Sequence, residues 1–151
     1  MNVTYAHLCD YATISREGKL SAMGIFETIF VQQFPAVHPL MHLVFGLEVR
    51  RAEFNQPFEL KIKLVTHDGG TIAELVMQGQ INATPNIPNP GQVAHLPQML
   101  ALGGIPFQAP GTYSLDIFVN GDHKRGLSFN VTQPPQPPQR IVRPGQPGAQ
   151  P

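Results

Sequence analysis

The sequence contains no tryptophan, only one cysteine (Cys9) and few charged residues. Of its 151 residues, 10 are Lys or Arg and 10 are Asp or Glu; together these make up 13% of the chain, about half the usual share. Residues 1–133 hold eight basic and ten acidic residues, a net charge of −2, whereas Arg140 and Arg143 give the rest a charge of +2. Neither part has the basic excess that phosphate binding requires, so the composition argues against a nucleic acid partner.

Long apolar runs are also missing. No stretch approaches the ~18–20 apolar residues of a membrane-spanning helix. The first residues contain neither the basic nor the apolar region of a secretory signal. One cysteine cannot form an intrachain disulfide, so we expect a cytoplasmic protein held together by packing alone, with no membrane attachment.

The sequence also lacks the short motifs that carry enzymatic chemistry. It has no GxSxG nucleophile turn, no GxGxxG or GxxxxGK[ST] phosphate loop, and its carboxylates are scattered. We therefore expect a protein that is not an enzyme and that uses no cofactor. A small enzyme with catalytic residues dispersed along the chain stays open.

Proline is abundant, and its distribution divides the chain. Seven of the 16 prolines fall in residues 134–151, where Gln and Gly fill most of the remaining positions. Such a composition predicts a disordered tail after a domain formed by residues 1–133. Within the tail, Pro135, Pro138 and Arg140 fit the PxxPx[KR] pattern of polyproline II segments that bind aromatic grooves; a tether or solubilising segment accounts for the same composition.

The apolar residues of the domain alternate with a period of two, which is typical of half-buried strands. In residues 41–50, for example, Met41 and every second residue through Val49 share one face, while His42, Glu48 and Arg50 share the other. No convincing helix is present, although residues 98–102 could form one turn. The predicted strands cover residues 3–14, 20–31, 41–50, 58–64, 71–81, 94–107, 113–120 and 127–131.

Turn signals separate these segments. Asp68-Gly69 and Asn120-Gly121 are typical of tight hairpin turns, and residues 85–92 form a proline-rich loop. The pattern predicts an all-β domain, an antiparallel two-sheet β-sandwich of immunoglobulin-like type with seven or eight strands. Gly111 followed by Tyr113 at the start of a late strand favours a tyrosine corner, in which the hydroxyl bonds to nearby backbone.

One cluster, His7 and Cys9, combines a base with a nucleophile. On a strand these two side chains share a face with Cα atoms ~6.6 Å apart, close enough to converge on one metal ion. Asp10 would point to the opposite face, and no second cysteine supplies a further ligand. We therefore predict no metal site, with His7 and Cys9 as weak candidates and a buried thiol as the simpler interpretation.

Several strings resemble an uncharacterised family of small bacterial proteins, a domain of unknown function. The opening residues 8–12 (LCDYA), then GKL at 18–20, GIF at 24–26 and Ile29, are similar to the start of that family, and PGTY at 110–113 with Asn120-Gly121 to its end. The resemblance covers most of residues 5–131. It implies a bacterial cytoplasmic origin and transfers no catalytic residue.

The leading functional hypothesis is a protein-interaction or assembly module. Unpaired sheet edges must be covered or paired, and residues 20–31 and 71–81 carry few charges that would discourage pairing. We therefore expect a protein partner, or a second copy, at one of these edges. The alternative is a small-ligand or metal-binding domain that uses residues 85–92 or the face of His7 and Cys9.

Overall fold

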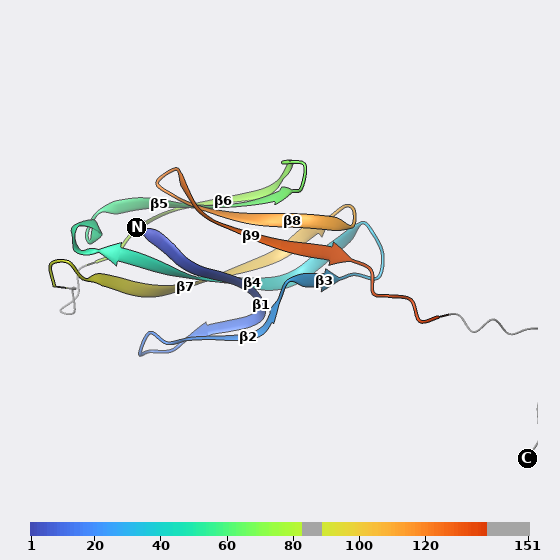
Figure 1. The fold of residues 1–151 in the computed structure, drawn as a ribbon, viewed down its shortest axis with the longest axis horizontal. Helices are drawn as coiled ribbons and strands as arrows, with labels where there is room; N and C mark the ends of the chain where they lie inside the picture. The colour runs from blue at the N-terminus through green and yellow to red at the C-terminus, as the bar shows by residue number, and fades with distance from the viewer. Residues whose placement is uncertain (83–88, 139–151) are drawn as a thin grey trace, which may run out of the picture.

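The computed structural model describes residues 1–82 and 89–138 and contains nine strands there (Figure 1). The only helix among these residues is the single turn η1 (Arg51–Glu53), so none is long and apolar enough to cross a membrane. The strands are β1 (Asn2–Ile14), β2 (Leu20–Phe26), β3 (Thr28–Phe30), β4 (Ala36–Arg50), β5 (Pro57–Thr66), β6 (Thr71–Gln80), β7 (Val93–Phe107), β8 (Gly111–Val119) and β9 (Asp122–Thr132).

The strands form two sheets, which confirms the predicted all-β architecture. Sheet A has the order β2-β1-β4-β7, and sheet B has the order β3-β9-β8-β5-β6. The prediction of seven or eight strands is wrong for the described residues, because residues 20–31 are not one strand. The chain leaves sheet A after Phe26 and enters sheet B at Thr28, where β3 runs parallel to β9 rather than antiparallel.

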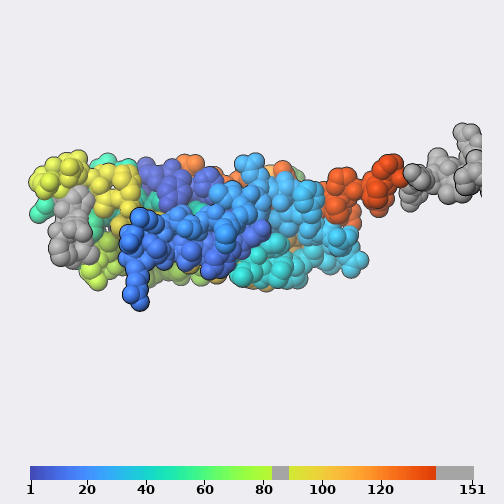
Figure 2. Space-filling model, turned by 90° about the horizontal axis from the view of Figure 1, so that it is seen from below, coloured from blue at the N-terminus to red at the C-terminus, as the bar shows by residue number. Residues whose placement is uncertain are grey.

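β1 changes its partner halfway along its length. Its first part pairs with β4 as far as Cys9, and the part from Leu8 to Ile14 pairs with β2. Figure 1 shows β1 turning back at this point, so that the β1–β2 hairpin lies as a further layer on the outer face of sheet A. Seen from below, the hairpin crosses the middle of this face (Figure 2).

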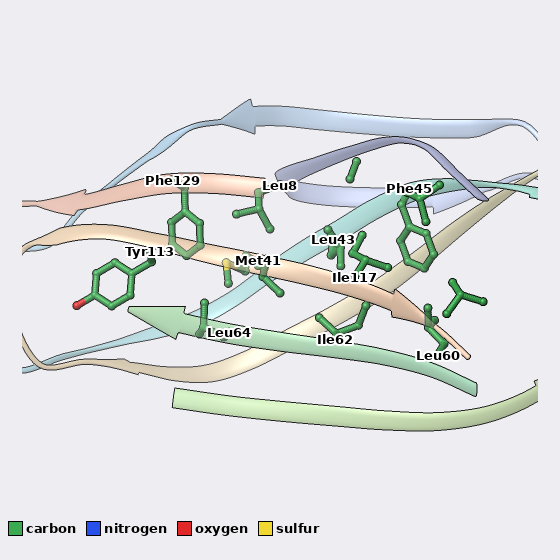
Figure 3. Close-up of a cluster of buried hydrophobic side chains, with 14 of the residues drawn as sticks. Leu8, Met41, Leu43, Phe45, Leu60, Ile62, Leu64, Tyr113, Ile117 and Phe129 are labelled. Carbon is green, nitrogen blue, oxygen red and sulfur yellow. The ribbon is translucent and has the colours of Figure 1, made fainter. Parts of the chain in front are cut away.

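The main core fills the space between the two sheets, as Figure 3 shows. Alternate side chains of each strand point into this core. In β4, every second residue from Met41 to Val49 is buried there, as the sequence predicts. Strand β8 contributes Tyr113, Leu115, Ile117 and Val119 in the same way. Phe107, Tyr113 and Phe129 pack with ring centroids 4.9–6.1 Å apart at one end of the core.

The other face of β4 is also buried, which the alternation does not predict. Val44 is 1% exposed and packs with Cys9 and Ala12 under Leu20 and Ala22 of the hairpin. His42 is 7% exposed; its Nδ1 lies 3.1 Å from the Asp10 carbonyl oxygen, and its ring meets the edge of Tyr11. The β1–β2 hairpin therefore removes from water a face expected to be polar.

Strand β7 is also more regular than expected. Pro97, Gly103, Gly104 and Pro106 favour an interrupted strand, yet β7 pairs with β4 without a register shift from Val93 to Phe107. The proposed helical turn at residues 98–102 is wrong, because these residues pair with β4. Prolines are tolerated because β7 lies at the edge of sheet A, where one side of the strand needs no partner.

The predicted hairpin turns are present. Asn120 and Gly121 have φ values of 52° and 82°, the left-handed conformation that a two-residue hairpin turn requires. Gly69 has φ 86°, and its N–H donates to the Thr66 carbonyl at 3.0 Å, which closes the turn between β5 and β6. Both turns use a residue type that adopts this conformation at little cost.

Tyr113 ties the start of β8 to the preceding turn. Its hydroxyl donates a hydrogen bond of 2.5 Å to the Ala109 carbonyl, four residues earlier, while its ring is buried against Phe107. This is the geometry expected of a tyrosine corner. Gly111, the first residue of β8, has φ 155°, a backbone conformation that residues with a side chain rarely adopt.

Replacing Tyr113 with Phe is expected to lower the free energy of unfolding by about 1 kcal/mol, since the ring packing stays and one hydrogen bond is lost. Chemical denaturation measures the change. Tyr11→Phe is the control and should change stability by less than about 0.5 kcal/mol, because Tyr11 is half exposed. Equal effects of the two substitutions would show that the bond to Ala109 contributes nothing.

Candidate functional site

His7 and Cys9 lie in very different surroundings. His7 is exposed and stacks on Tyr5, with ring centroids 6.3 Å apart. Cys9 is fully buried under the hairpin, and its Sγ lies 3.7 Å from the His42 carbonyl oxygen. Burial raises the pKa of the Cys9 thiol above its ordinary value, and the neighbouring Asp10 carboxylate adds to the shift.

A metal ion needs several converging ligands, and a buried neutral thiol is a poor one. Among residues 1–82 and 89–138, no group of three or more His, Cys, Asp or Glu side chains is placed to hold an ion. The Asp10 side chain lies against Gly24 of β2. The structure therefore gives His7 and Cys9 no further ligand in its described part.

The tail begins beside β3. The Val31 N–H donates to the Thr132 carbonyl at 2.9 Å, and Gln133 Nε2 donates to the Gln32 carbonyl at 3.0 Å. Pro135 and Pro138 are exposed and belong to no strand. Arg140, the third residue of the predicted polyproline motif, lies outside the described residues, as does the first half of the predicted loop at 85–92, residues 85–88.

A polar pocket of about 340 Å³ lies near the start of β1 and the end of β4. Two of its charged groups form an ion pair, the Met1 ammonium and the Glu53 carboxylate. Glu53 also accepts a 2.7 Å hydrogen bond from the Arg50 backbone N–H. Partial burial opposes the charged form of Glu53, but these contacts outweigh it and lower its pKa. These groups are engaged in holding the chain start against η1.

The four sheet edges differ in how well they are protected. In sheet A, β7 contains Pro97 and Pro106, which have no N–H to offer, and β2 has seven residues with Gly24 in the left-handed conformation at φ 67°. In sheet B, β3 has only three residues. By contrast, β6 has ten residues, no proline and one charged side chain, Glu74. It is the least protected edge in the described part of the chain.

Apolar pockets open between the sheets along this edge. One, of about 240 Å³, is lined by Leu75 of β6 together with β7 residues that include Leu102 and Ile105. The other, of about 200 Å³, lies at Met77 and Gly79 and reaches Phe45 of the core. The sequence gives no sign of these pockets, because they depend on the distance between β6 and β7.

A further depression lies where the chain crosses from sheet A to sheet B. We call it the β2–β3 groove; it has a volume of about 360 Å³. Ile25 and Phe30 are 58% and 61% exposed at its rim. Its lining consists of Asp10, Gly24, Ile25, Phe26, Thr28, Ile29, Phe30 and His38. Three strings that carry the family resemblance, around Asp10, Gly24 and Ile29, therefore meet here.

The Cys9 thiol reports on the hairpin. Because the thiol is buried and its pKa is raised, we expect alkylation in the native protein to be at least about a hundredfold slower than in denaturant. Mass spectrometry after timed exposure to iodoacetamide measures the two rates. Rapid labelling of the native protein would mean that the hairpin opens readily from sheet A.

Comparison with known proteins places the chain in a family. No curated protein matches it. A family model, described as a family of unknown function (DUF6941), matches residues 4–132, which includes all nine strands except the first two residues of β1. The prediction of an uncharacterised domain of unknown function is thereby confirmed, and the chain belongs to the family of unknown function DUF6941.

Proposed function

We propose that this protein is a non-enzymatic interaction module that receives an extended segment of a protein partner along β6. The observation that carries the proposal is the unprotected length of β6 at the edge of sheet B. A strand edge of this kind offers a row of N–H and C=O groups to another chain.

We place the protein in the cytoplasm of a bacterium, on the grounds of its single cysteine and its family resemblance.

The apolar pockets give this edge a means of selection. Leu75 lines one pocket and Gly79 the other, four residues apart, which is ~13 Å along a strand. Side chains i and i+4 of an added strand lie on one face at the same spacing. Backbone pairing would supply affinity, and two apolar side chains in this register would supply specificity.

The immunoglobulin-like assignment belongs to the same proposal. It is supported by two sheets enclosing one core and by the Tyr113 hydroxyl bond to Ala109. Sandwiches of this type have exposed edges that pair with other chains, which agrees with the role suggested for β6.

A small-ligand domain is the second candidate, and the apolar lining of the β6–β7 pockets favours it. However, their volumes of about 240 and 200 Å³ lie below the roughly 300 Å³ at which small-molecule sites begin. Each has room for one side chain of a partner more readily than for an independent ligand.

A photo-crosslinking amino acid at Val76, which is 46% exposed on β6, tests the proposal in cells of the source organism. We expect a discrete crosslinked product, because an added strand would lie against this position. A product of twice the 16.5 kDa chain mass identifies a second copy, and any other mass a different protein.

Val37 is the matched control, since it is also an exposed valine but lies on β4 in sheet A. It should give no such product. A second variant, Leu75→Lys combined with the crosslinker at Val76, should reduce the product at least about fivefold by placing a charge at the pocket. Equal products at Val76 and Val37, or none at Val76, would count against β6 as the binding edge.

A further inference from the structure

The β2–β3 groove combines aromatic side chains with an acidic group. Phe26 and Phe30 line it, and Asp10 lies at its side. A Cβ atom at Gly24 would overlap the Asp10 carboxylate, so the left-handed glycine allows the carboxylate to lie directly on β2. No basic side chain in the described part of the chain forms an ion pair with Asp10.

His38 adds a hydrogen-bonding group without a partner. Its ring packs edge-on against Phe26 at a centroid distance of 6.4 Å, and the side chain lines the groove. His38 Nε2 is buried and has no hydrogen-bond partner among the described residues. Buried polar atoms in native proteins are nearly always paired, so Nε2 gains a partner if the His38 ring turns toward a ligand in the groove.

These features match the chemistry of a proline-rich segment with a basic residue. A polyproline II helix has no internal hydrogen bonds, so its carbonyl groups are available as acceptors, and its proline rings pack on aromatic side chains. The tail of this chain has that composition, with Pro135 and Pro138 followed by Arg140. The only charged residues after Gln133 are Arg140 and Arg143, which complement Asp10 and the nearby Glu27.

The position of the tail indicates which copy it reaches. Phe30 at the groove rim pairs with Thr132, the last residue of β9, so the tail starts next to the groove of its own molecule. The described residues up to Pro138 then lead away from the body (Figures 1 and 2). In polyproline II geometry, five residues span ~16 Å, and prolines resist a tight reversal. A second molecule is therefore the accessible target.

We propose that the tail segment around Pro135, Pro138 and Arg140 binds in the β2–β3 groove of a second copy of this chain. The proline rings pack on Phe26 and Phe30, and the arginine pairs with Asp10. The His38 ring turns toward the groove and donates a hydrogen bond to a tail carbonyl. Since each molecule has its tail and its groove at the same end, a twofold axis at that end lets two copies exchange tails. This interaction uses no residue of β6 and is independent of the function proposed for that edge.

Sedimentation equilibrium of the full chain over a concentration series tests the proposal. We expect association that weakens at high salt, because an Arg–carboxylate pair contributes to it. Asp10→Asn and the double variant Arg140→Gln/Arg143→Gln should each raise the dissociation constant about five- to tenfold. A synthetic peptide of residues 133–151, added in excess, should return the wild-type chain to monomers by occupying the groove.

Two controls separate the groove from other surfaces. Asp122→Asn changes an exposed carboxylate at the start of β9, which does not line the groove, and should leave association unchanged. Val76→Lys should also leave it unchanged. A monomer at every concentration overturns the proposal. So does association that survives Asp10→Asn and excess peptide, and loss of association only with Val76→Lys would assign self-association to β6.

Discussion

Strand β4 is hydrogen-bonded on both sides, to β1 and β7, and covered on both faces, by sheet B and by the β1–β2 hairpin. Its odd-numbered residues from Met41 to Val49 build the main core, and Val44 on the opposite face anchors the hairpin through Cys9 and Ala12. From Met41 to Leu47 the strand therefore has no edge and no solvent face, and the other strands are arranged around this segment. At ~25 cal/mol per Å² of apolar surface, covering its second face is a substantial addition to the stability that one core supplies.

The hairpin on β4 also determines where the molecule is open. After Cys9, β1 no longer pairs with β4 and the hairpin folds over sheet A. After β2, the chain passes through Glu27 and enters sheet B as β3. The β2–β3 groove lies at this crossing, because neither sheet continues across it. On the other side of the sandwich, β6 and β7 are the last strands of their sheets, and the apolar pockets lie between them. Both candidate surfaces are thus consequences of strand order.

Alternation and turn chemistry were sufficient to predict most of the strands, since each depends on residues close together in the chain. The buried face of β4 and the turn at Asn120-Gly121 were predicted from them. The edge position of residues 71–80 was suggested by their low charge, which had named residues 71–81 as one of two candidate edges. The burial of His42, the division of residues 20–31 and the continuity of β7 were not. Each depends on a partner distant in sequence. The hairpin covers His42, β9 pairs with Thr28–Phe30, and pairing with β4 keeps β7 a continuous strand despite the prolines in β7. The groove was missed for the same reason, although an unusual glycine between apolar residues, Gly24, was a signal.

The two surfaces would recognise their ligands by different forces. Pairing along β6 would depend on backbone hydrogen bonds and on apolar side chains entering the pockets, so it would respond weakly to salt and strongly to a charge at Leu75. The β2–β3 groove places one carboxylate, Asp10, beside Phe26 and Phe30, so an interaction of this carboxylate with an arginine would be screened as ionic strength rises. Because the tail and the groove share one end of the molecule while β6 lies along the sheet edge, a tail-exchanged pair leaves both β6 edges available. A dimer of this kind would present two equivalent binding edges, and a partner with two suitable segments would bind it more tightly than it binds either edge alone.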